Sequence, residues 1–189
     1  METALSIAIG VGLSAACGFR IFVPLLIMSV ASISGYLPLS SGFSWIGTYP
    51  ALIAFATAAV LEVGAYFIPW LDHALDTIAS PAAVVAGTIV TASVVTEMSP
   101  FLKWTLALVA GGGIAGIVQG STVALRAKST VLTAGLGNPI VALAELIGAT
   151  GTALLAILLP VVALIVIASL LIYIIRKTGH LVFGRRPVT

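Results

Sequence analysis

Long uncharged stretches, separated by isolated charged residues, dominate the pattern of the chain. Four of these stretches reach or exceed the roughly 20 residues that an α-helix needs to span about 30 Å of hydrocarbon. They cover residues 21–61, 77–96, 104–125 and 146–175. The pattern therefore predicts an all-helical protein embedded in a membrane.

Glycines, prolines and polar clusters divide these stretches further, because such residues interrupt or end helices. The resulting segments predict a polytopic bundle of about six crossings. They cover residues 4–30, 50–68, 82–96, 101–125, 138–158 and 161–175. The first is too long for one straight span and contains Gly18, Arg20 and Pro24. We therefore expect a full helix followed by a broken or re-entrant piece, which is tolerated at membrane depth only where it faces protein or a water-filled cavity.

Two connecting segments have patterns of their own. Residues 34–49 are uncharged, rich in turn formers and contain four aromatic residues. Aromatic residues are enriched where a membrane meets water, so this segment predicts a loop on the membrane surface. Residues 69–80 are expected to form a short amphipathic linker helix, with Asp72 and Asp76 on one face because they stand four residues apart.

Composition agrees with a membrane protein. Hydrophobic residues make up 60% of the chain and charged residues 7%, whereas soluble proteins have about 25% charged residues. We expect one integral membrane domain over residues 1–189, surrounded by the lipid bilayer. The net charge is only +2, and the basic residues are not interleaved with aromatic ones, which argues against nucleic-acid binding. A single cysteine, Cys17, cannot form an internal disulfide.

Basic residues predict the orientation of the chain. Arg126 and Lys128 follow the fourth predicted crossing, and four further basic residues follow the last one, Arg176, Lys177, Arg185 and Arg186. Positively charged loops favour the cytoplasmic side of a membrane. With six crossings, both termini are then expected in the cytoplasm.

A glycine, a glutamate and a proline occur in the same order in the two halves of the chain. Sliding the second half over the first aligns Gly18 with Gly120, Glu62 with Glu145 and Pro81 with Pro160. Repeat 1 would cover about residues 1–99 and repeat 2 about residues 100–177, followed by a basic cytoplasmic tail over 178–189. Halves of three crossings each enter the membrane in opposite directions, which is the inverted-repeat plan of many secondary transporters. The alternative is a chance similarity between apolar stretches.

Two segments resemble a known family. They are residues 12–26 (GLSAACGFRIFVPLL) and residues 51–76 (ALIAFATAAVLEVGAYFIPWLDHALD). The landmarks are a Gly-x-Arg before an apolar run and a Glu-x6-Pro-x2-Asp-x3-Asp pattern that starts at Glu62. Nearly the whole chain resembles the bacterial membrane proteins catalogued as domain of unknown function forty-one twenty-six. The resemblance implies a compact polytopic protein of the bacterial cytoplasmic membrane and brings no activity with it.

Glu62 and Glu145 are the main candidates for a functional site. A charged side chain at the centre of a spanning helix costs roughly 2.5–3.5 kcal/mol, so such residues usually have a function. They could bind a proton or a cation, because a buried carboxyl group can be protonated near neutral pH. They could equally form structural ion pairs with Arg20 and Arg126. Both interpretations can hold together.

Arg20 and Arg126 can each be interpreted in two ways. The guanidinium of Arg20 suits bidentate binding of a carboxylate or phosphate, or it could extend to the membrane surface. Arg126 either marks the cytoplasmic boundary together with Lys128 or points into the core.

Two other motifs suggest weaker hypotheses. Asp72 and Asp76 could share one divalent cation, although aspartates that cap a solvated linker explain the same spacing. Gly112, Gly116 and Gly120 recur every four residues, which predicts close helix packing within the chain or in a homodimer. No cofactor is expected apart from that cation.

The favoured function is transport of a small ion or an anionic, lipid-borne substrate, coupled to a proton or cation through Glu62 and Glu145. Arg20 and Arg126 would complete the binding site. An intramembrane enzyme that acts on lipid head groups with a metal at Asp72 and Asp76 is one alternative, and the sequence favours a non-enzyme over it. A non-catalytic assembly or scaffold subunit is another.

Overall fold

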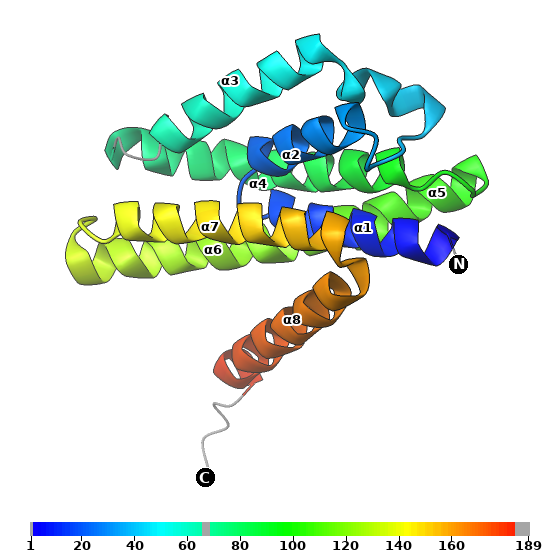
Figure 1. Ribbon diagram of the computed structural model, residues 1–189. Coiled ribbons are helices and arrows are strands. Elements are labelled where there is room, and N and C mark those ends of the chain that lie inside the picture. Colours follow the sequence, from blue (N-terminus) through cyan, green and yellow to red (C-terminus); the bar gives the residue numbers. More distant parts are fainter. Residues whose placement is uncertain (1, 66–68, 184–189) are drawn as a thin grey trace.

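The computed structural model describes the backbone of residues 2–65 and 69–183 and the side chains of residues 3–65 and 77–176. All regular elements in these ranges are helical (Figure 1). They are α1 (Glu2–Cys17), α2 (Phe22–Ile33), η1 (Ser41–Gly47), α3 (Tyr49–Ala65), α4 (Pro69–Val94), α5 (Pro100–Leu106), η2 (Ala107–Gly112), α6 (Gly113–Thr133), α7 (Asn138–Leu158) and α8 (Pro160–Phe183). The predicted all-α class is confirmed.

Helix α1 forms the centre of the bundle. It packs against α4, α6, α7 and α8, and the side chains of Leu13, Ala15, Ala16 and Cys17 have no exposed surface. Small residues allow this close packing, because a Cβ atom added to Gly12 would lie 2.4 Å from the Cβ of Ala156 on α7. Interfaces of small residues are typical of helices that pack without a hydrophobic driving force between them.

The long helix made of α5, η2 and α6 packs closely on α4. A Cβ on Gly112 would lie 2.6 Å from Thr88 Oγ1, and one on Gly116 would lie 3.1 Å from a methyl group of Val84. A Cβ on Gly120 would meet nothing within 4 Å among the described residues. The glycine repeat therefore packs within the chain at its first two positions, while Gly120 is open.

Helices α1 and α2 form a hairpin. Thr91 donates a hydrogen bond of 3.1 Å to the carbonyl of Gly10 on α1, and Ser93 Oγ lies 3.6 Å from the sulfur of Met28 on α2. The middle parts of both helices thus lie beside the same end of α4. The expected interruption near Gly18 is present, but α1 has 16 residues and α2 has 12, so each is shorter than a spanning helix.

Two predicted boundaries are wrong. The expected linker helix over 69–80 and the crossing over 82–96 form the single helix α4, which continues through Pro81. Proline inside a helix removes one backbone hydrogen bond, a loss that membrane helices tolerate where neighbours compensate. The fourth crossing extends past residue 125 to Thr133, and its end follows from the left-handed backbone of Ala134 (φ 50°) and Gly135 (φ 88°).

Three helices in the described part of the chain are long and apolar enough to cross a membrane, at Thr77–Val94, Pro100–Thr133 and Asn138–Leu158. A fourth is present if the bent pair of η1 and α3, with 65° between its helices, counts as one span. Pro160–Arg176 on α8 is a shorter apolar helix. The total of about six crossings stays a prediction.

The expected surface loop contains η1 and is fixed at Ser40. The backbone amide of Ser40 donates to the carbonyl of Ser93, and Lys103 Nζ donates to Ser40 Oγ at 2.8 Å. The rings of Tyr36, Trp45 and Tyr49 are exposed. Exposed aromatic rings in this position are consistent with the predicted membrane–water interface.

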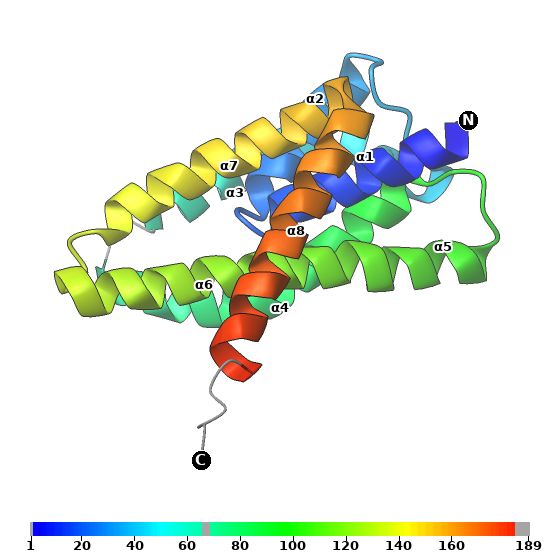
Figure 2. The same ribbon diagram turned by 90° about the horizontal axis from the view of Figure 1, so that it is seen from below.

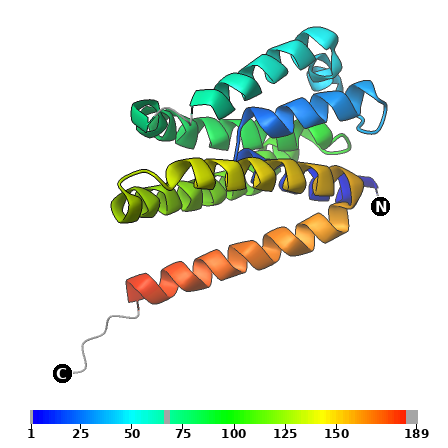
Figure 3. The same cartoon turned by 60° about the vertical axis from the view of Figure 1, so that its left-hand side comes forward.

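The helices run back and forth between two ends of the molecule. Helix α1 begins at the end marked N, and the connection between α6 and α7 lies at the opposite end (Figure 1). Helix α3 runs away from the N end, whereas α7 runs toward it (Figure 1). Helix α8 starts where α7 finishes and packs on α1 (Figure 2), and its far part separates from the other helices (Figure 3).

Candidate functional site

The site forms where α1 breaks. Gly18 ends α1, and Arg20 and Ile21 connect it to α2. Only a residue without a side chain fits at position 18, because an added Cβ would lie 2.6 Å from both the carbonyl oxygen of Ala115 and the Cβ of Val118 on α6. The break therefore lies deep between helices, and it presents both a charged side chain and the free amides of a helix start.

Glu145 on α7 pairs with two arginines. Arg126 Nε donates to Glu145 Oε1 at 2.9 Å, and Arg126 Nη2 donates to Glu145 Oε2, so the contact is bidentate. Arg20 Nη2 lies 3.2 Å from Glu145 Oε2 and donates to the carbonyl of Ala142 at 3.1 Å. The side chains of Arg20, Arg126 and Glu145 are 1%, 3% and 4% exposed, so these ion pairs are buried.

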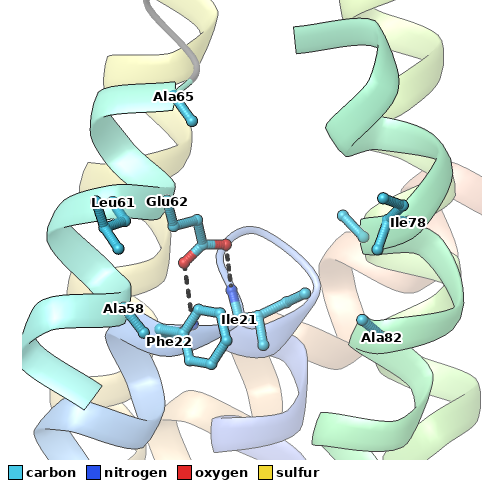
Figure 4. A pocket seen from close by; sticks show the side chains of 9 residues that line it. Ile21, Phe22, Ala58, Leu61, Glu62, Ala65, Ile78 and Ala82 are labelled. Carbon is cyan, nitrogen blue, oxygen red and sulfur yellow. Dashed lines mark hydrogen bonds between the residues drawn. The ribbon is translucent and has the colours of Figure 1, made fainter. Parts of the chain in front are cut away.

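Glu62 on α3 binds the start of α2. Its Oε1 accepts a hydrogen bond of 2.8 Å from the amide of Ile21, and its Oε2 accepts one of 3.0 Å from the amide of Phe22 (Figure 4). The first amides of a helix lack partners within the helix and carry a partial positive charge. A carboxylate from another helix satisfies both here, so Glu62 connects α3 to the broken helix.

The two glutamates therefore lie near each other, on either side of the break. The amide that binds Glu62 follows Arg20 directly in the chain, and Arg20 pairs with Glu145. The Glu62 carboxylate is attracted electrostatically by Arg20 and repelled by Glu145. Four charges from α3, α6, α7 and the break compensate one another within the bundle.

Glu62 also lines an apolar groove between α3 and α4 (Figure 4). One pocket of about 410 Å³ contains Glu62, Leu61, Ile78 and Ala82 in its walls, with Ile21 and Phe22 beneath. A second pocket of about 520 Å³ shares Ile21, Phe22, Ile78 and Ala82 with it and extends to Trp45 and Phe55. Among the lining residues that the structure describes, Glu62 alone is charged.

Arg126 and Lys128 have different positions, although only one residue separates them. Arg126 is buried and pairs with Glu145, whereas Lys128 is exposed. The interpretation that both mark the membrane boundary is therefore wrong for Arg126, which points into the core.

The predicted metal residues, Asp72 and Asp76, have side chains outside the described ranges. Within those ranges, no group of three or more His, Cys, Asp or Glu residues could hold a metal ion. The divalent-cation hypothesis stays a prediction.

The residues aligned in the proposed repeat have equivalent structural positions only in part. Glu62 and Glu145 lie close together on α3 and α7, which run in opposite directions (Figure 1). Gly18 ends a helix while Gly120 lies inside one, and Pro81 lies inside a helix while Pro160 begins one. The inverted repeat therefore stays a hypothesis.

Some groups of the site belong to the backbone, so the charged residues of the sequence do not indicate them. The amides of Ile21 and Phe22 and the carbonyl of Ala142 are backbone groups, and any residue type supplies them. The signal available in the sequence was the predicted break near Gly18, because a helix that starts inside a membrane needs an acceptor for its first amides.

Comparison with known proteins identifies the family. Residues 7–179 match the family described as Domain of unknown function (DUF4126). Searches of curated proteins and of solved structures found no match. The match covers most of the chain and agrees with the resemblance of the Glu62 and Arg20 segments, so the chain belongs to the DUF4126 family.

Proposed function

We propose that the protein is a small membrane transporter in which Glu62 is the exchangeable carboxylate. It would move a small ion or a lipid-borne substrate, coupled to a proton. The observation that carries the proposal is the position of Glu62, which contacts a broken helix on one side and an open groove on the other. Helices that break near the membrane centre, with their ends at the binding site, are the usual arrangement in secondary transporters.

Glu145 has the other role, that of a fixed counter-ion. It neutralises Arg20 and Arg126 in a buried bidentate arrangement, and removing one member would leave an uncompensated buried charge. Glu62 is bound only by two backbone amides among the described contacts of its carboxylate. Its release would not separate an ion pair, so exchange is easier at Glu62 than at Glu145.

Proton exchange at Glu62 would take place beside several ionisable groups. Arg20 favours the charged carboxylate and Glu145 opposes it, while Cys17 lies within electrostatic range. Protonation would weaken the bonds to Ile21 and Phe22, because a neutral carboxyl group is a poorer acceptor than a carboxylate. Helix α3 packs on α2 and η1, so loss of this contact would free one end of α3.

We further propose a cytoplasmic membrane location in which the α6–α7 connection faces the cytoplasm. The exposed residues Lys128, near the end of α6, and Arg176, near the end of α8, lie toward that side, as the positive-inside rule favours. The hairpin of α1 and α2 starts and finishes at the other end. This revises the expectation of a cytoplasmic N-terminus, because that expectation required the first segment to cross.

The test is pH-driven flux in proteoliposomes that contain the purified protein and a pH-sensitive dye. A pH gradient should drive uptake from a panel of small ions and amphiphilic probes in the unmodified protein and in Glu97→Gln, which changes an exposed acid in the turn after α4. Glu62→Gln should abolish that flux. Unchanged flux in Glu62→Gln would refute the proposal.

A second candidate is a non-catalytic assembly subunit, which the complete pairing of Glu145 favours. In that case the charges only hold the helices together. Isolation of the protein with a stoichiometric partner, together with no flux in any proteoliposome assay, would support this candidate.

A further inference from the structure

The groove beside Glu62 is open at its rim. Helix α3 packs against α2 and η1, whereas α4 packs against α1, η2 and α6, and the two pockets lie between α3 and α4. Leu61 and Ile78, which face each other across the opening, are 66% and 67% exposed (Figure 4). In a membrane these apolar side chains meet lipid, so a ligand reaches the groove from the bilayer.

The lining restricts the chemistry of that ligand. The walls are alanine, leucine and isoleucine side chains, with Trp45 and Phe55 at the far part of the second pocket. Pockets of this size and apolar character bind molecules of a few hundred Å³ that are mostly hydrophobic. The occupant is therefore a lipophilic molecule that fills the groove with its apolar surface.

The charge of the ligand follows from Glu62. Each oxygen of a carboxylate can accept more than one hydrogen bond, and the amides of Ile21 and Phe22 use one on each. The remaining acceptor capacity lies at the groove, while Arg20 is engaged with Glu145. A carboxylate at the groove repels an anion and attracts a cation, so a cation is the complementary partner.

A pocket of similar size on the other side of α2 serves as a comparison. It measures about 420 Å³ and lies between α2 and α7, with Leu26, Ile27 and Leu154 in its walls. None of its described lining residues is charged. Lipid chains would fill either pocket, but only the groove with Glu62 can also select for charge.

We propose that the groove between α3 and α4 binds lipophilic cations, with Glu62 as their counter-charge. This inference rests on the proposed function and names the substrate class of the same site. A proton and the cation would occupy the Glu62 carboxylate in turn, so one would be exchanged for the other.

Two probes of matched size and opposite charge test the inference. Tetraphenylphosphonium is a lipophilic cation and tetraphenylborate a lipophilic anion of nearly the same shape. Equilibrium dialysis of the purified full chain should show saturable binding of the cation and at least tenfold weaker binding of the anion. The cation should bind Glu97→Gln as tightly as the unmodified protein and Glu62→Gln at least tenfold less tightly.

A second variant covers the case in which Glu62→Gln fails to fold. Ala82 lines both pockets from α4, so Ala82→Phe fills the groove without changing the charged cluster. It should also reduce binding of the cation at least tenfold, with an unchanged gel-filtration profile.

Three results would overturn the inference. They are equal binding of both probes, tighter binding of the anion, and unchanged cation binding in a folded Glu62→Gln or Ala82→Phe variant. If pH-driven flux of another substrate persists while the cation does not bind, this inference fails and the transport proposal stands. If the cation binds but no flux of any substrate is found, the transport proposal fails instead.

Discussion

Glu62 and Glu145 are the same residue type in different environments. Glu145 forms salt bridges with two buried arginines, whereas Glu62 accepts hydrogen bonds from two amides at a helix start. An ion pair inside a bundle is hard to break because each partner depends on the other for its charge. We therefore expect the two residues to differ in their effects on stability.

Replacing Glu145 should destabilise the protein strongly. Glu145→Gln leaves Arg20 and Arg126 without their common counter-charge, and breaking a buried pair in this way costs about 3–5 kcal/mol. Thermal denaturation in detergent, followed by tryptophan fluorescence, measures the effect. A melting temperature equal to that of Glu97→Gln would contradict the assignment of Glu145 as a buried counter-ion.

Replacing Glu62 should have a smaller effect. Glutamine keeps one carbonyl oxygen, so Glu62→Gln loses the acceptor for one of two amides, and loss of a helix cap costs about 0.5–2 kcal/mol. In the same assay its melting temperature should fall between those of Glu97→Gln and Glu145→Gln. A loss as large as that of Glu145→Gln would show that Glu62 belongs to the ion-pair core.

At this scale the sequence offered ion pairs of the glutamates with Arg20 and Arg126, but not which glutamate would form them. Intramembrane charges must pair, which made Arg20 and Arg126 the available candidates for the glutamates. The division of roles could not be predicted, because the amides that bind Glu62 carry no residue-type signal. Arg126 and Lys128 lie about 200° apart around a helix, and the apolar sequence on either side does not indicate which faces the core.

At the scale of elements, hydropathy predicted where helices lie but not how they connect. The segment over 138–158 matches α7 at both ends because Pro139 and Pro160 bracket it. The same rule failed at Pro81, which lies inside α4. Hydropathy also does not predict the direction in which a helix runs. That α2 runs back alongside α1 is seen only in the structure, where Thr91 and Ser93 on α4 contact Gly10 on α1 and Met28 on α2.

The central position of α1 leads to a prediction for its glycines. Gly12→Ala places a Cβ 2.4 Å from that of Ala156, and overpacking of this kind costs about 1–3 kcal/mol. Gly120→Ala meets open space inside a helix, where alanine is about 1 kcal/mol better than glycine. The melting temperature should fall for the first and stay equal or rise for the second. A stable Gly12→Ala would contradict the close packing of α1 on α7.

At the scale of the whole molecule, the proposed topology follows from which connections lie at the same end of the molecule. The outer end of α1, the η1 loop and the turn between α4 and α5 lie together, and the α6–α7 connection lies at the other end (Figure 1). The number of predicted crossings alone gave the opposite placement for the start of the chain. The proposed topology differs because a segment can enter a membrane without crossing it.

Cysteine labelling in intact cells tests this topology. Ala4 and Lys128 are exposed, whereas the native Cys17 is fully buried and gives no background. A membrane-impermeant maleimide should label Ala4→Cys in intact cells and Lys128→Cys only after permeabilisation. Labelling of both positions under the same condition would contradict the re-entrant hairpin.

The central claim is that Glu62 exchanges its proton while Glu145 remains a charged counter-ion. Infrared difference spectroscopy of the reconstituted protein during a pH titration detects the stretch of a protonated carboxyl group. Exposed carboxyl groups such as Glu97 also protonate at acidic pH, so the band of Glu62 is the component that Glu97→Gln retains and Glu62→Gln lacks. A spectrum of Glu62→Gln with every protonated-carboxyl component of the unmodified protein, or loss of a component in Glu145→Gln alone, would contradict the claim.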